Sequence, residues 1–179
     1  MINKRIFIGP LLVLLLTGFL PLESLGQESI NWVSIEVAEE KAAEDGKKIL
    51  IDMYTDWCGW CKRMDAVTYT NEQVISFINE NFHAVKFDAE QKEEVEVAGH
   101  TFKFVPQGRR GYHELAASLL QGQLSYPTTT FLSSDFKLIY NVPGFLDAKK
   151  MGNILAFTQE EAFKHTTFPE FEAAKNKAN

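Results

Sequence analysis

The sequence contains little cysteine and little histidine, with two cysteines and four histidines among 179 residues. The cysteines form one C-x-x-C pair, Cys58 and Cys61, and the chain has no second pair. The histidines stand far apart in the chain, at His83, His100, His113 and His165. Structural zinc sites need either a second C-x-x-C pair or two closely spaced histidines beside the first. The pair is therefore an incomplete zinc site, and we expect neither a metal nor a cofactor.

The sequence also lacks a surplus of basic residues. Lysine and arginine total 18 against 24 aspartate and glutamate residues, so the formal net charge is -6. The basic clusters, Lys62-Arg63 and Arg109-Arg110, are too short to follow a phosphate backbone and are typical of solvated surface. We therefore expect no nucleic-acid partner.

The first 26 residues have the pattern of a secretory signal peptide. A basic start at Lys4 and Arg5 precedes the apolar run Ile6–Leu16, and small residues follow at Ser24-Leu25-Gly26. We expect a signal peptide over 1–26 and a single domain over 27–179, exported in a bacterium to the periplasm. The alternative is an uncleaved membrane anchor over Ile6–Leu22, although glycines and prolines interrupt this run.

Hydrophobic periodicity predicts helices and strands that alternate in the first half of the domain. Amphipathic patterns indicate helices, and continuous apolar runs of β-forming residues indicate buried strands. The predicted elements are a helix over Trp32–Gly46, a strand over Lys48–Tyr54, a helix over Cys58–Thr70, a helix opened by Asn71 with Val74, Ile75, Phe77 and Ile78 on its inner face, and a strand over Phe82–Asp88.

The second half of the domain continues with shorter elements. They are a hairpin within 95–104 around Ala98-Gly99, a helix over Gly111–Leu120, strands over Thr128–Leu132 and Lys137–Asn141, and one or two helices over Leu146–Lys164. This order predicts an α/β fold in which a mixed sheet has helices on both faces.

The cysteine pair is a poor stabilising crosslink. A disulfide across so short a loop removes roughly 2 kcal/mol of unfolded-chain entropy, against roughly 4 kcal/mol or more across a whole domain. Since Cys58 lies just after a strand at the first turn of a helix, unpaired N–H groups and the helix dipole stabilise its thiolate. Cys58 is therefore the expected nucleophile. Cys61, one turn further on and shielded, is then placed to attack the mixed disulfide and release the product.

The stretch Lys48–Met64, with Trp57 before Cys58-Gly59-Trp60-Cys61-Lys62, resembles the thioredoxin superfamily. Its WCGWCK form is similar to that of secreted bacterial thioredoxin-like proteins related to the reductase domain of the Dsb electron-transfer system. The resemblance covers about residues 31–157 and implies a thioredoxin-like fold. An insertion of about 89–125, expected to hold the hairpin and the helix, precedes the cis-proline strand, and a C-terminal helical extension covers about 158–179. Such an insertion is typical of a partner surface or a lid.

The resemblance implies roles for two residues behind the cysteine pair. Asp52 lies within an apolar strand, where an ionised carboxylate is costly to bury. It would be the general base that accepts the proton of Cys61, with its pKa raised by desolvation. Lys86, on the neighbouring strand, would tune this acid, and surface exposure is the alternative for Lys86.

The resemblance also implies a substrate-binding surface in front of the pair. In the superfamily a cis proline lies against the cysteines, and the backbone before it pairs with an extended substrate segment. Tyr126 and Pro127 match that position, with an ordinary turn proline as the alternative. Trp57 and Trp60 would offer an apolar rim to extended protein substrates, with packing in the core or a turn as the alternative.

The dipeptide Gly59-Trp60 adds no cation beside the first thiolate, which favours a reductase of protein disulfides over a strong oxidant. A disulfide oxidase or isomerase is the alternative within the enzyme class. A binding or assembly factor with vestigial cysteines is the alternative outside it. In an oxidising compartment a reductase needs a resupply of electrons, so we expect a membrane-bound electron donor as well as protein disulfide substrates. These residues predict neither the donor's identity nor the oligomeric state.

Overall fold

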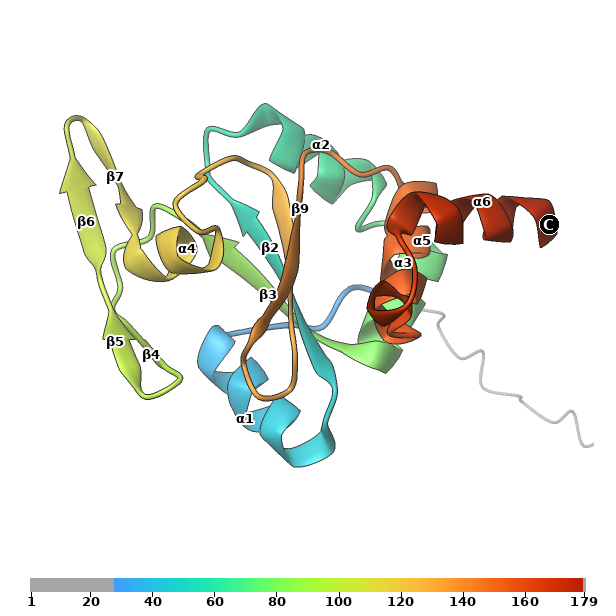
Figure 1. Cartoon of the computed structure of the whole chain (residues 1–179). Coiled ribbons are helices and arrows are strands. Elements are labelled where there is room, and N and C mark those ends of the chain that lie inside the picture. The colour runs from blue at the N-terminus through green and yellow to red at the C-terminus, as the bar shows by residue number, and fades with distance from the viewer. Residues whose placement is uncertain (1–27, 179) are drawn as a thin grey trace, which may run out of the picture.

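Strand β2 (Lys48–Tyr54) runs through the middle of the sheet in the computed structural model, which describes residues 28–178. Within these residues a five-stranded sheet has the order β1-β3-β2-β8-β9 (Figure 1). Its other strands are β1 (Trp32–Val33), β3 (Phe82–Asp88), β8 (Thr128–Leu132) and β9 (Leu138–Pro143). β3 runs parallel to β1 and to β2, whereas β8 runs antiparallel to β2 and to β9. The sheet is therefore mixed, as the sequence predicts.

Helices pack on both faces of the sheet (Figure 1). One face is covered by α1 (Ile35–Asp45) and α4 (Glu114–Leu119), and the other by α2 (Gly59–Val67), α3 (Glu72–Asn81) and α5 (Ala148–Gln159). A short 3-10 helix (Ala162–Lys164) and α6 (Phe168–Ala178) follow α5. α6 lies within the predicted C-terminal extension, and its Phe168 and Phe171 pack against Phe157 of α5.

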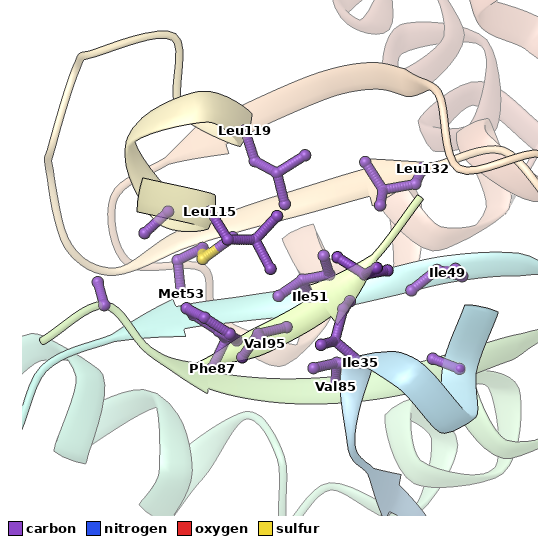
Figure 2. Close-up of a cluster of buried hydrophobic side chains, with 14 of the residues drawn as sticks. Ile35, Ile49, Ile51, Met53, Val85, Phe87, Val95, Leu115, Leu119 and Leu132 are labelled. Atoms are coloured by element: carbon purple, nitrogen blue, oxygen red, sulfur yellow. The ribbon is translucent and has the colours of Figure 1, made fainter. Parts of the chain in front are cut away.

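The alternation of side chains along β2 divides the core into two clusters. Ile49, Ile51 and Met53 point to the α1 and α4 face, and Figure 2 shows them packed there with Ile35. Leu50 points to the opposite face, which α2, α3 and α5 cover. Since side chains of a strand alternate between faces, Asp52 also points toward α2. The fold thus directs one carboxylate of a buried strand at the helix that carries the cysteines.

Strands β2, β3 and β8 have the predicted bounds, and α3 begins after Asn71 as predicted. The Asn71 side chain accepts the N–H of Val74 and so caps the helix. The expectation of a helix from Trp32 is wrong at its start, because Trp32 and Val33 pair with β3 and the helix begins after Ser34. The helix predicted to reach Thr70 ends three residues earlier, at Val67.

The insertion holds one more hairpin than the sequence predicts. The expected hairpin is confirmed as β4 (Val95–Val97) and β5 (His100–Phe102). The helix predicted from Gly111 is wrong in its first part, because β6 (Phe104–Gln107) and β7 (Arg110–His113) form a second hairpin and α4 begins at Glu114. Gly111 lies against the Phe104 ring, where the glycine lets the two strands approach. Both hairpins lie on the side of the molecule opposite α5 and α6 (Figure 1).

Two expectations concern residues that the structure does not describe. The predicted signal peptide over 1–26 and the alternative anchor over Ile6–Leu22 both lie outside residues 28–178. Within the described part of the chain, no helix combines the length and the apolar character that are needed to cross a membrane.

Candidate active site at the cysteine pair

The cysteine pair lies where β2 leads into α2. Cys58 is the N-cap residue of α2 and Cys61 lies in its first turn. Their sulfurs form a disulfide, and both residues are buried, with 4% and 2% of their surface exposed. The N–H of Cys61 donates to Cys58 Sγ over 3.1 Å. The helix start therefore supplies an N–H group and a favourable dipole to the first sulfur, as the sequence predicts.

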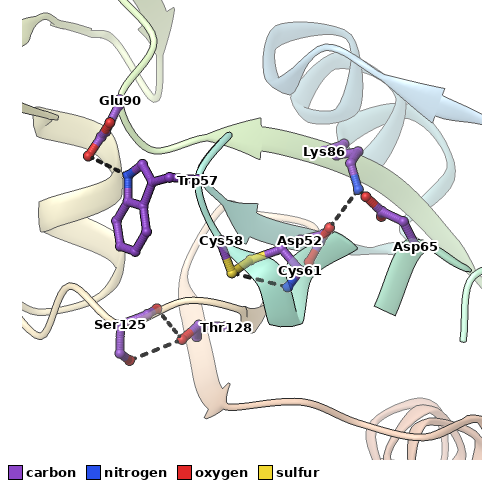
Figure 3. Close-up of a disulfide and its surroundings, with 9 residues drawn as sticks. All are labelled: Asp52, Trp57, Cys58, Cys61, Asp65, Lys86, Glu90, Ser125 and Thr128. Carbon is purple, nitrogen blue, oxygen red and sulfur yellow. Dashed lines mark hydrogen bonds and ion pairs between the residues drawn. A yellow bond between two sulfur atoms is a disulfide. The ribbon is translucent and has the colours of Figure 1, made fainter. Parts of the chain in front are cut away.

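Asp52 lies behind the pair and is joined to α2 through a lysine. It is 1% exposed, and Lys86, its register partner on β3, donates from Nζ to Asp52 Oδ2 over 3.0 Å. Lys86 also contacts the carboxylate of Asp65 on α2 (Figure 3). Asp65 and Cys61 are four residues apart and share one face of the helix. Lys86 therefore connects Asp52 to the helix face that carries the second cysteine.

Burial and neighbouring charges have opposite effects on Asp52. Desolvation raises the pKa of Asp52 above its usual value, and the charge of Lys86 partly offsets that rise. Burial acts to lower the pKa of Lys86, but the carboxylates of Asp52 and Asp65 more than compensate, so this pKa is raised as well. Lys86 thus stays charged, while Asp52 holds its proton more tightly than an exposed aspartate.

Two buried hydroxyl side chains complete the surroundings of Asp52. Thr129 lies opposite it on β8, and Tyr69 follows α2. Asp52 Oδ1 and the hydroxyl oxygens of Tyr69 and Thr129 are all buried, and the Tyr69 hydroxyl acts to lower the pKa of Asp52. Desolvation outweighs this effect and accounts for the raised pKa of Asp52. We call Asp52, Asp65, Tyr69, Lys86 and Thr129 the rear cluster.

Aromatic side chains flank the pair on its outer side. Trp57 and Trp60 are 51% and 60% exposed, so both indoles lie at the surface and not in the core. Trp57 meets the ring of Tyr126 edge-on at a centroid distance of 6.1 Å, and Trp60 lies 5.5 Å from the ring of Phe145. We call Trp57, Trp60, Tyr126 and Phe145 the front rim. The front rim is therefore an aromatic surface beside the cysteine motif.

The loop before β8 has the backbone form that the resemblance to thioredoxins implies. The Tyr126–Pro127 peptide bond is cis, and the carbonyl of Pro127 accepts a hydrogen bond from Gly144 N over 2.8 Å. Burial, with the nearby Glu90 and Asp88 carboxylates, raises the pKa of Tyr126 to about 12. Its phenol is therefore neutral at physiological pH.

Of the eight candidate residues, two form the disulfide and the other six lie around it, and the structure adds residues that the sequence did not single out. Asp65 has a signal that could have found it, namely its four-residue spacing from Cys61. No sequence signal points to Tyr69 or Thr129, because their neighbours come from distant parts of the chain. Arg110 was interpreted as solvated surface, and it is exposed, but its guanidinium stacks on Trp57.

The arrangement is suited to thiol-disulfide exchange. A thiolate at a helix start can attack a disulfide, and a buried carboxylate behind the second cysteine can accept that thiol's proton. Metal chemistry has no comparable support, because residues 28–178 contain no group of three or more His, Cys, Asp or Glu side chains placed to hold an ion.

Comparison with known families gives a match over most of the chain. The model of the Thioredox_DsbH family, described as "Protein of unknown function, DUF255", matches residues 21–166. The chain belongs to the Thioredox_DsbH family. The match begins before the described residues and includes the cysteine pair, the rear cluster and the whole insertion. This member of the family thus carries its candidate site inside the family's shared region.

Curated relatives match this Thioredox_DsbH protein over short segments. Thiol:disulfide interchange protein DsbD of Haemophilus ducreyi is 41% identical over 50 residues, which are 28% of this chain and 9% of that protein. A protein disulfide-isomerase of Schizosaccharomyces pombe is 31% identical over 101 residues, 54% of this chain and 26% of its own. Spermatogenesis-associated protein 20 of Rattus norvegicus is 32% identical over 65 residues, 36% of this chain and 8% of its own. The chain therefore spans a small part of these longer proteins.

Solved structures establish the fold of this family member. A thioredoxin-fold protein from Helicobacter pylori superimposes with a TM-score of 0.53 at 19% identity, covering 75% of this chain and 82% of the other. A thioredoxin from Thermus thermophilus gives a TM-score of 0.54 at 13% identity, with 73% and 87% covered. The Thioredox_DsbH protein thus has the thioredoxin fold that the sequence predicts.

Proposed function

We propose that this protein is an exported thiol-disulfide oxidoreductase that reduces protein disulfides. The observation that carries the proposal is the C-x-x-C pair at the start of α2 with Asp52 buried behind it. The matches to DsbD and to a protein disulfide-isomerase support the same chemistry. No metal or organic cofactor takes part in the proposed reaction.

In the proposed reaction the Cys58 thiolate attacks one sulfur of a substrate disulfide. A mixed disulfide forms and the other substrate sulfur leaves as a thiolate, which takes up a proton. Asp52 then accepts the proton of Cys61, and the Cys61 thiolate attacks Cys58 Sγ. The second substrate sulfur leaves as a thiol, and the Cys58–Cys61 disulfide forms. Two electrons have then passed to the substrate, and a membrane-bound donor, itself a proposal, would return them.

Each of the remaining residues has a proposed part in this cycle. Lys86 would keep the proton affinity of Asp52 within a useful range, because its charge opposes the effect of burial. Trp57 and Trp60 would contact the substrate beside the sulfurs. The backbone at Tyr126 and Pro127 would pair with an extended substrate segment, a mode of recognition that suits disulfides in unfolded chains.

The absence of a cation from the dipeptide between the cysteines supports the proposed reductive direction. Gly59 and Trp60 carry no cation, and Arg63 lies over the Phe145 ring, at 5.8 Å from its centroid. Without further stabilisation of the reduced form, we expect a reduction potential of roughly -200 to -270 mV, and not the roughly -120 mV of a strong oxidant. Equilibration with defined thiol-disulfide buffers measures the potential. A value near the oxidant's would support a disulfide oxidase instead.

A trapping experiment tests the enzyme class and identifies the substrates. Cys61→Ala stops the second step, so the natural substrate should remain joined to Cys58 and can be identified by mass spectrometry. Cys58→Ser in the same background is the control and should trap nothing. A Cys58→Ser protein with unchanged activity in cells would instead favour a binding or assembly factor with vestigial cysteines.

Export is a separate part of the proposal. The pattern of residues 1–26 supports cleavage before residue 27, leaving a single domain over 27–179. N-terminal sequencing of the protein from the cell envelope would test this. A chain that keeps its first residues and stays with the membrane would support the anchored alternative over Ile6–Leu22.

A further inference from the structure

Trp57 is held on three sides although half of its surface is exposed. Its Nε1–H donates to Glu90 Oε1 over 3.0 Å, a contact that Figure 3 shows beside the disulfide. The guanidinium carbon of Arg110 lies 4.4 Å from the indole centroid, and the ring of Tyr126 meets the indole edge-on. A surface indole with one contact can change rotamer, whereas these contacts together favour a single orientation. The side chain directly before Cys58 is thereby fixed.

Arg110 reaches the indole because the β6–β7 hairpin is fixed at its base. The N–H of His113 donates to the carbonyl of Ala89 over 2.7 Å, and His113 is fully buried. The N–H of Glu114, which follows β7, donates over 2.9 Å to the carbonyl of Lys103, the residue before β6. Arg110 begins β7, three residues before His113. The hairpin therefore holds the backbone of Arg110 in place beside the active-site helix.

The close pairing within this hairpin depends on Gly111. A Cβ at this position would lie 2.2 Å from Phe104 Cζ and 2.4 Å from the carbonyl oxygen of Val105. Any side chain at 111 would therefore move β7 away from β6. Such a change would displace Arg110 while leaving every residue that contacts the indole chemically unaltered.

We propose that Arg110 is a positioning residue for Trp57, and that through it the inserted hairpin controls how protein disulfides reach Cys58. The inference rests on the proposed thiol-disulfide exchange and gives the insertion a role in it. The flat guanidinium covers one face of the indole, so a substrate meets the remaining surface in a set orientation. The binding of extended protein segments, which would contact the front rim, would depend on that orientation. The binding of a small disulfide such as oxidised glutathione would not depend on it.

The kinetic test compares Arg110→Ala with Arg109→Ala in the full protein. Arg109 is the exposed neighbour and carries the same charge, so its variant controls for net charge. For insulin as substrate, we expect Arg110→Ala to raise KM about two- to fivefold, as the loss of one cation–π contact implies, with kcat kept. Reduction of oxidised glutathione should be unchanged in both variants. Arg110→Lys keeps the charge but loses the planar stack, so its KM for insulin should lie between those of the wild type and Arg110→Ala.

A second test needs no turnover. In the ¹⁵N-labelled oxidised protein, the indole N–H signal of Trp57 is assigned by its loss in Trp57→Phe. In Arg110→Ala and in Gly111→Ala this signal should shift and show faster motion, whereas Arg109→Ala should leave it in place. Glu90→Gln keeps an oxygen acceptor for the indole N–H and should retain the ordered signal that Glu90→Ala loses.

Two results would overturn the inference. One is an indole signal and an insulin KM that are the same in Arg110→Ala as in Arg109→Ala. The other is an equal loss of insulin and glutathione reduction in Arg110→Ala, which would place the effect on the sulfur chemistry itself. A wild-type protein that reduces neither substrate would contradict the proposed function instead, and the indole signal would still decide whether Arg110 holds Trp57.

Discussion

Behind the disulfide, the buried carboxylate of Asp52 is paired with Lys86, whereas in front of it the indoles of Trp57 and Trp60 are exposed. The rear cluster joins β2, β3 and α2 through Lys86, Asp52 and Asp65. The front rim takes Trp57 and Trp60 from the active-site motif and Tyr126 from the loop before β8, and the insertion adds Arg110. Buried charges interact strongly with a proton, and exposed rings interact with an incoming chain. From this difference we expect the proposed proton transfer and the proposed substrate recognition to be separable by mutation.

The largest effect on the reaction rate should come from a substitution in the rear cluster. Asp52→Asn removes the proposed proton acceptor for Cys61, so the release of the mixed disulfide should slow about a hundredfold at neutral pH. Single-turnover kinetics with a protein disulfide measure this step. Asp56→Asn changes an exposed carboxylate close by in the chain and should have little effect. Equal rates for the two variants would remove Asp52 from the mechanism.

The same substitution should change stability in a pH-dependent way. Because the pKa of Asp52 is raised in the folded protein, the folded state binds a proton more tightly than the unfolded chain. Stability should therefore fall as pH rises from the ordinary aspartate pKa through the raised value. Asp52→Asn should remove this loss and stabilise the oxidised protein at neutral pH by about 1 to 3 kcal/mol, with less effect at pH 4. Urea unfolding at several pH values measures the difference.

Substitution of Lys86 and of Asp65, the two charged neighbours of Asp52, should shift the pH-rate profile by smaller amounts and in opposite directions. Lys86→Gln removes the charge that lowers the pKa of Asp52, so the acidic limb of the pH-rate profile should move to higher pH. Asp65→Asn removes a charge that raises this pKa, so the limb should move to lower pH. Since Asp65 is partly exposed, its effect on the rate at neutral pH should stay within about fivefold. Shifts in the same direction would contradict the contact pattern.

The smallest effect on the reaction should come from a substitution in the front rim, and we expect it in the KM for a protein substrate. Trp60→Ala should raise KM for insulin about two- to fivefold and leave the reduction of oxidised glutathione unchanged. Its effect on unfolding free energy should be below about 0.5 kcal/mol, because the side chain is mostly exposed. Val67→Ala changes an exposed apolar side chain of the same helix and is the matched control. A loss of glutathione reduction in Trp60→Ala would contradict the expected separation between proton transfer at the rear cluster and substrate recognition at the front rim.

The sequence predicted what depends on neighbours along the chain. β2 has a continuous apolar pattern, Cys58 follows it at a helix start, and Asp52 stands out as an acid within that pattern. These features are local, and the periodicity of the sequence records them. The place of Lys86 beside Asp52 was implied by the resemblance to thioredoxins, and the register of β2 and β3 agrees with it.

What the sequence did not predict depends on contacts between distant segments. The strand at Trp32 has two residues and exists because β3 pairs with it, which a helical pattern in the same stretch hides. The second hairpin depends on the approach of Gly111 to Phe104. The stack of Arg110 on Trp57 in turn depends on the position of that hairpin, so the sequence around neither residue predicts this contact.

The edges of the sheet also bear on how the protein behaves at high concentration. A long exposed edge strand offers free backbone groups to which other chains can add, the first step of aggregation. Here one edge, β1, has two residues, and the other, β9, ends at Pro143, which has no N–H to donate. The pairing of β9 with β8 is also irregular between Phe131 and Leu132. Both edges are thus poor templates for further strands, which would suit a protein with the extended substrates proposed above.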